Sequence, residues 1–343
     1  MKFDIARQPL VPAFLTLAAL AVVAMWNAGG TAADTAALAG HAAETVGTGR
    51  NATGALAVSS PGELLAQFQE AHPVWARWIA GLLMLFTGMS VGRLTVRYNL
   101  YSVGTCLAIP LYGAIACGLA VGSDYLTAFA ASALLALATK NFCRSYCNGF
   151  GFDAIFRASL YIGLLPLVAT AAAPLLVLLP LAVMLFRRTL REVTVAVAGL
   201  LLPVLTLCYV NWGAGGGFLA PVAELGSAFV AGMPLSLFLS TPVQSLVLLG
   251  AVFILDLMAL LFFLSDIHAL GTKPRLIFIF NISVLLLTAA VLCGPAATPG
   301  TVALAAVPSA VLLPFMFVRI HRAIALPLYL LLLTAAVIST VLQ

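Results

Sequence analysis

The segment Phe152–Glu192, FDAIFRASLYIGLLPLVATAAAPLLVLLPLAVMLFRRTLRE, decides how this chain folds. Between Arg157 and Arg187 it carries 29 uncharged residues. That run is too long for one membrane-spanning helix and is long enough for two short ones joined by a tight turn. Because arginines flank both ends of the run, both ends are predicted to face the cytoplasm. The sequence therefore predicts a membrane hairpin that fixes the orientation of the rest of the chain.

Composition extends this prediction to the whole chain. Of its 343 residues, 63% are hydrophobic and only 8% are charged, whereas a soluble domain carries about 25% charged residues. The apolar runs are continuous rather than alternating, which excludes a transmembrane β-barrel. Backbone amides in hydrocarbon must pair within their own segment, so the runs are predicted to be helices. We expect an all-α polytopic membrane bundle that forms one integral membrane domain over residues 1–343.

Eleven transmembrane helices are predicted, and the distribution of the basic residues supports an odd number of crossings. With a cytoplasmic N-terminus, fourteen of the sixteen Lys and Arg residues fall in cytoplasmic segments, and only Arg50 and Arg77 fall outside. This loop asymmetry accounts for the net charge of +5 without nucleic acid. The first apolar run is nearly 20 residues long, which favours a retained span over a cleaved signal peptide. The predicted spans are residues 10–28, 75–92, 102–121, 125–139, 155–170, 172–187, 193–210, 243–264, 276–293, 301–318 and 323–341.

Two predicted outer loops, residues 29–74 and 211–241, are longer than a connection needs. In the first, Ser60 is placed to cap a helix that starts at Pro61, with Leu64, Leu65 and Phe68 on one face. The second is predicted to form an interfacial helix on the outer leaflet, with a re-entrant segment as the alternative.

Asp256 is the only carboxylate deep within a predicted span. An ionised side chain at mid-membrane costs about 2.5–3.5 kcal/mol on insertion scales. The residue should therefore be protonated, paired or in contact with water. Asn281, at a similar depth on the next helix, is its predicted partner. The pair is either an interhelical hydrogen bond that sets helix register or a proton- or cation-coupled site.

Basic residues at the predicted inner surface could hold a phosphate or a lipid headgroup, or could serve only to set the topology. Cys143 and Cys147 lie four residues apart, but no second ligand pair accompanies them. We therefore predict no metal site and no cofactor. The headgroup or phosphate candidates are Arg319, His321, Arg322, Arg187, Arg188 and Arg191.

Residues on the predicted outer side form a further set of candidates. Arg77 lies between Trp75 and Trp78, where it could reach lipid headgroups or contact an anionic substrate. The acidic candidates of the first outer loop are Asp34, Glu63 and Glu70.

Residues 140–191 resemble a family of uncharacterised multi-span bacterial inner-membrane proteins. The similarity rests on Asn141-Phe142, on the run from Phe152 to Arg157, and on the sequence LLPLAVMLFRRTLR that ends at Arg191. It implies a multi-pass protein of the bacterial cytoplasmic membrane and carries no established activity. The expected partners are membrane lipids and other membrane subunits.

Three classes of function are compatible with the sequence. The first is a transporter or a non-enzymatic component of an envelope-building or secretion system, which needs only helices, prolines and a buried polar group such as Asp256. The second is an enzyme similar to the GT-C glycosyltransferases, which use lipid-linked sugars. That similarity implies a catalytic acid in loop 29–74, although the paired acidic motif of those enzymes is absent after the first span. The third is a structural subunit.

Overall fold

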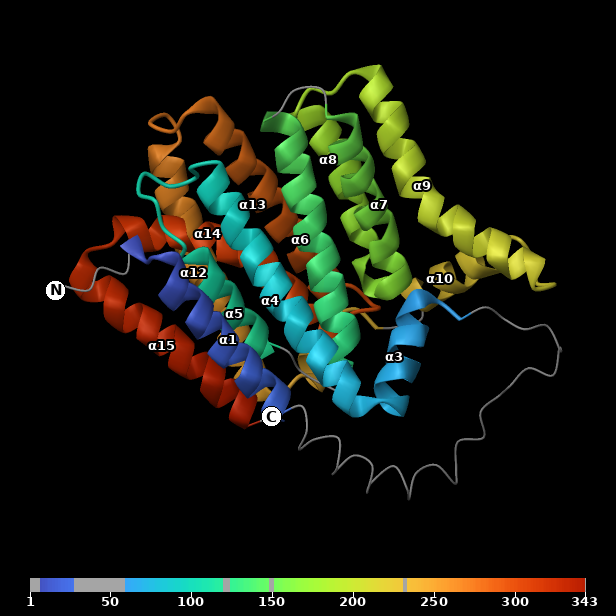
Figure 1. Cartoon of the computed structure of the whole chain (residues 1–343), viewed down its shortest axis with the longest axis horizontal. Coiled ribbons are helices and arrows are strands. Elements are labelled where there is room, and N and C mark those ends of the chain that lie inside the picture. The colour runs from blue at the N-terminus through green and yellow to red at the C-terminus, as the bar shows by residue number, and fades with distance from the viewer. Residues whose placement is uncertain (1–6, 28–58, 120–123, 148–150, 231–232, 343) are drawn as a thin grey trace.

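The computed structural model describes residues 7–27, 59–119, 124–147, 151–230 and 233–342. Within those ranges every regular element is helical, and the helices pack as a bundle (Figure 1). The elements are α1 (Leu10–Asn27), α3 (Pro61–Ala71), α4 (Pro73–Arg97), α5 (Ala108–Leu119), α6 (Tyr125–Cys147), α7 (Phe152–Val168), η2 (Thr170–Val177), α8 (Leu178–Leu185), α9 (Leu190–Gly213), α10 (Ala220–Val230), α11 (Ser236–Ser240), α12 (Val243–Asp266), α13 (Thr272–Leu292), η3 (Pro299–Ala305), α14 (Ala306–Arg319) and α15 (Arg322–Val341).

Seven helical segments of the described residues are long and apolar enough to cross a membrane, which identifies a membrane-embedded helical protein. Shorter apolar helices lie at Leu10–Trp26, Ala108–Leu119, Thr170–Leu185 and Ala220–Val230. Each of the eleven predicted spans overlaps a helical element, although the span predicted at 102–121 is described as helical only over Ala108–Leu119, and the number of crossings stays a prediction. The seven long segments are Pro73–Arg97, Tyr125–Cys147, Leu190–Gly213, Val243–Asp266, Thr272–Leu292, Pro299–Arg319 and Arg322–Val341.

The predicted hairpin is present as two short helical arms. The α7 helix ends at Ala169, whose backbone is extended, and the chain turns directly into η2 and then α8. Pro174 interrupts the second arm, where its missing N–H removes a helical hydrogen bond, and the first half of this arm is a 3₁₀ helix. The two arms pack against each other, so the chain reverses direction within this segment.

Glycines allow α7 and α9 to approach closely. A Cβ added at Gly163 would lie 2.3 Å from the carbonyl oxygen of Leu200, and one at Gly199 would lie 2.8 Å from that of Phe156. Small residues at a crossing let the backbones of membrane helices come into van der Waals contact. This contact holds the middle of α9 against α7, the first arm of the predicted hairpin.

Two helices occupy the centre of the bundle. Every residue of α5 is buried, and so is the whole of α14 up to Phe317. The two helices pack against each other, and α14 also packs against both α12 and α13. The segment Pro299–Arg319 changes its helix type along its length, because it begins as the 3₁₀ helix η3 and continues as α14, where Pro314 lacks the N–H of one helical hydrogen bond. A helix buried on all sides in this way has no face of its own for lipid.

The amphipathic helix predicted at Pro61 is confirmed. Ser60 Oγ accepts a hydrogen bond from Glu63 N at 3.3 Å, and Glu63 Oε2 accepts one from Ser60 N at 3.1 Å. This reciprocal capping box fixes the start of α3. In the second predicted outer loop, the expected helix is present as α10, which contains Glu224 and packs against α9 and η2, while its place on the outer leaflet stays a prediction.

Candidate functional site

Asp256 lies on α12 and is buried in the centre of the bundle, with 1% of its surface exposed. Its Oδ2 atom accepts a hydrogen bond of 2.5 Å from Ser309 Oγ in the first turn of α14. Its Oδ1 atom is also buried and has no hydrogen-bond partner among the described residues. A buried carboxylate with one unpaired oxygen is costly unless a proton or a cation neutralises it.

The prediction that Asp256 pairs directly with Asn281 is wrong. Asn281 Nδ2 donates to the carbonyl oxygen of Pro308 at 2.9 Å, one residue before Ser309. The reason is that α14 packs against both α12 and α13, so the two polar side chains bind consecutive residues of α14 instead. Asn281 Oδ1 is buried and, within the described ranges, has no hydrogen-bond partner. The site therefore contains two unpaired oxygens, both on side chains that anchor α14.

Tyr101 provides a third polar contact to the same part of α14. Its hydroxyl donates to the carbonyl oxygen of Val311 at 2.7 Å. Pro314 has no N–H and crowds the preceding turn, which leaves carbonyl groups of α14 open to other donors. Sequence reasoning missed this contact, because 210 positions separate the two residues and no local pattern links them.

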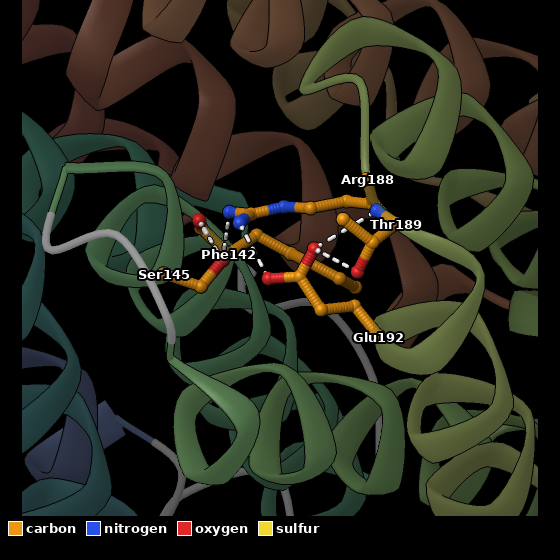
Figure 2. Close-up of polar contacts among 5 residues, drawn as sticks. All are labelled: Phe142, Ser145, Arg188, Thr189 and Glu192. Atoms are coloured by element: carbon orange, nitrogen blue, oxygen red, sulfur yellow. Dashed lines mark hydrogen bonds and ion pairs between the residues drawn. The ribbon is translucent and has the colours of Figure 1, made fainter.

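A second polar network joins the end of α6 to the turn before α9. Figure 2 shows Arg188 extending toward Ser145 and Glu192. Arg188 Nη2 donates to Ser145 Oγ at 2.6 Å, and Nη1 donates to Glu192 Oε1 at 3.2 Å. Glu192 Oε2 accepts from both Thr189 N at 3.0 Å and Thr189 Oγ1 at 3.1 Å, which caps α9 (Figure 2).

This network is largely withdrawn from solvent. The side chains of Arg188 and Glu192 are 10% and 6% exposed, and the guanidinium lies 5.8 Å from the centre of the Phe186 ring. Both oxygens of Glu192 are paired, and Ser145 in turn donates to the carbonyl oxygen of Phe142. Of the three candidate arginines in this turn, Arg188 is therefore partly buried, whereas Arg187 and Arg191 are exposed.

The other inner candidates lie around the junction of α14 and α15. Arg319 pairs with Asp266 at 2.7 Å and lies over the Phe315 ring. His321 caps α15, since its Nδ1 atom accepts from Ala323 N at 3.3 Å. Arg322 is exposed at the first position of α15. A carboxylate therefore already neutralises one of the three residues predicted to hold a phosphate.

The outer candidates do not converge on one site. Arg77 is half-buried on α4 and hydrogen-bonds Tyr125 at the start of α6. Glu63 is held in its capping box, and Glu70 is exposed near the end of α3. Asp34 lies outside the described residues.

Comparison of the chain with family models, with curated proteins and with solved structures found no match. The resemblance of residues 140–191 to a bacterial inner-membrane family therefore stays a prediction. Within the part of the chain that the structure describes, no three His, Cys, Asp or Glu side chains gather as a metal site would require.

Proposed function

We propose that this protein is a polytopic membrane transporter in which Asp256 binds the coupling proton or cation. The observation that carries the proposal is the half-paired carboxylate of Asp256, buried against the start of α14, where the chain passes from the 3₁₀ helix η3 into an α-helix. Transporters bind substrates and coupling ions near the bilayer midplane, at discontinuous helices. Asp256 is the fourteenth of the 24 residues of α12, which agrees with a position near the middle of a span.

The surroundings of Asp256 support a change of protonation or ion occupancy at this position. Ser309 provides one hydroxyl, and Asn281 Oδ1 provides a second oxygen without a hydrogen-bond partner among the described residues. Hydroxyl, amide and carboxylate oxygens are the groups that bind hard cations and relay protons in membrane proteins. A purely structural carboxylate would be expected to have both oxygens paired.

We further propose eleven crossings, a cytoplasmic N-terminus and a bacterial inner-membrane location. The α5 helix has 12 residues, about 18 Å of helix, which is too short to cross a bilayer alone. Leu100, Tyr101 and Leu107 in the segment before it are buried in protein. Irregular backbone is tolerated at membrane depth under that condition, so this segment can complete the crossing.

A glycosyltransferase similar to the GT-C enzymes has less support from the described residues. The Glu63 carboxylate accepts a hydrogen bond from the Ser60 backbone at the start of α3, so it is engaged in the helix cap. The acids of loop 29–74 remain the residues that such an enzyme would need.

The proposal is tested with purified protein in liposomes that contain a trapped pH-sensitive dye. Gradients of amino acids, sugars, nucleosides and organic cations are imposed one at a time, with a potential clamped by potassium and valinomycin. We expect the wild-type protein to move protons, or sodium in a parallel tracer assay, with at least one class of solute. We expect Asp256→Asn to abolish that flux.

The matched control is Asp266→Asn, which removes a carboxylate from the end of the same helix, where it pairs with Arg319. This variant should keep the coupled flux. Equal flux through wild type and Asp256→Asn, or loss of flux in both variants alike, would contradict the assignment of Asp256.

A further inference from the structure

Four cationic side chains gather where α4 and α6 end. Arg93 and Arg97 lie four residues apart on α4, and Lys140 and Arg144 lie four residues apart on α6. Residues at that spacing share one face of a helix. The two helices pack together and run in the same direction in Figure 1. We refer to these four residues as the α4–α6 cation cluster.

Electrostatic contacts show that the four charges lie near one another. The charge of Lys140 interacts with those of Arg93, Arg144 and Arg97. Tyr98, in the turn that follows α4, interacts electrostatically with two of the same groups. Burial and the neighbouring Cys147 and Cys143 raise its pKa, and the positive charges of Arg97 and Arg144 oppose that rise. Lys273, at the start of α13, lies near the edge of the cluster, because its charge and that of Arg97 both interact with Cys147.

No carboxylate among the described residues forms an ion pair with the cluster. The three ion pairs found within the described ranges use other cations: Arg157–Asp153, Arg188–Glu192 and Arg319–Asp266. Arg93, Arg97 and Arg144 are exposed and Lys140 is half-buried. Four like charges held together without a counter-charge repel one another, and a bound anion would relieve that repulsion.

The positive-inside rule explains why basic residues occur on one side of the membrane. The rule does not require basic residues to face each other across two packed helices. Arg187 and Arg191, for example, are exposed and do not belong to this cluster. Basic pockets between transmembrane helices bind the phosphate of lipid headgroups, and arginine matches phosphate oxygens with paired N–H groups.

We propose that the α4–α6 cation cluster is a binding site for a phosphate group, presented by an anionic phospholipid or by a soluble phosphate compound. The exposed arginines provide access from the membrane surface, and the half-buried Lys140 defines the depth of the site. The site is separate from Asp256, so it stands whether or not the chain is a transporter.

The test uses the full-length protein in nanodiscs of phosphatidylcholine alone or of phosphatidylcholine with phosphatidylglycerol. We expect phosphatidylglycerol to raise the midpoint of thermal unfolding and to remain bound to the protein in native mass spectrometry. Inorganic phosphate is titrated into the phosphatidylcholine discs, against sodium chloride of equal ionic strength. A response to phosphatidylglycerol alone identifies a lipid, and a response to phosphate in neutral discs identifies a soluble ligand.

The variant Arg97→Gln with Arg144→Gln removes two cations from the cluster. Each removed cation should weaken phosphate affinity roughly fivefold, and the pair roughly 25-fold. The control Arg7→Gln with Arg157→Gln removes the same charge elsewhere and should respond as the wild type does. The number of lipids retained is a readout that does not depend on stability. The proposal is overturned if the cluster variant and the control respond alike, or if neither ligand affects the wild-type protein.

Discussion

The two buried carboxylates Asp256 and Glu192 differ in how completely their oxygens are paired. Glu192, at the start of α9, bonds Arg188 through one oxygen and Thr189 through the other. Asp256, inside α12, bonds Ser309 through one oxygen, and the other has no partner among the described residues. Both residues are at most 5% exposed. Burial alone therefore does not separate their roles.

The difference indicates which carboxylate fixes the fold and which is available for chemistry. A fully paired buried charge resists change, because breaking any one contact leaves its partner unpaired. A half-paired carboxylate can gain a proton or a cation without breaking a contact already made. We therefore propose a structural role for Glu192 and a functional role for Asp256.

The largest effect on stability is expected when the pairing of Glu192 is removed. Glu192→Ala leaves the Arg188 guanidinium buried without its counter-charge and should lower the free energy of unfolding by about 3–5 kcal/mol. The measurement is reversible unfolding in detergent with sodium dodecyl sulfate. Asp153→Ala is the matched control, because it removes an i,i+4 pair with Arg157 whose side chains are 64% and 55% exposed. That control should lower the free energy of unfolding by less than about 0.5 kcal/mol. Equal losses in the two variants would contradict a structural role for Glu192.

A smaller effect is expected at the crossing that holds α9 beside α7. Gly163→Ala places a Cβ against the backbone of Leu200, so the helices must separate, at about 1–3 kcal/mol. Gly250→Ala on α12 is the control, since a Cβ there meets nothing within 4 Å and alanine favours a helix. The same unfolding assay compares the two variants. A Gly163→Ala protein as stable as Gly250→Ala would show that α7 and α9 do not depend on this close approach.

The next effect concerns the anchoring of the helix that carries Ser309. Tyr101→Phe removes the hydrogen bond to Val311 and should lower the free energy of unfolding by about 1 kcal/mol. Tyr146→Phe is the control, because Tyr146 stacks on Phe186 and its hydroxyl forms no hydrogen bond with the residues that the structure describes. If both substitutions leave the stability unchanged, the polar contacts on α14 are not what holds this helix in place.

Local features of the fold followed from the sequence. Ser60 and Glu63 sit three residues apart at the start of α3 and form the predicted capping box. The uncharged run between Arg157 and Arg187 predicted the two arms of the hairpin, because length and flanking charge are properties of the segment itself. Both signals depend on neighbours within a few residues.

The partners within the sites could not be predicted in the same way. Asn281 was expected to bind Asp256 because antiparallel helices joined by a short turn usually pack together. That expectation failed because α14, more than 20 residues further along, packs against both helices. The contact between Arg188 and Ser145 also joins residues 43 positions apart. The sequence identified Asp256 and Arg188 as candidates through their charge, but their partners depend on packing between distant helices.

The most direct test of the functional assignment measures flux and stability in the same preparation of Asp256→Asn. An amide can still accept the hydrogen bond from Ser309, so the free energy of unfolding should change by less than about 1 kcal/mol. Proton- or sodium-coupled flux in liposomes should fall to the level of protein-free vesicles. A variant that keeps its coupled flux would contradict the account, because Asp256 would then not bind the coupling proton or cation.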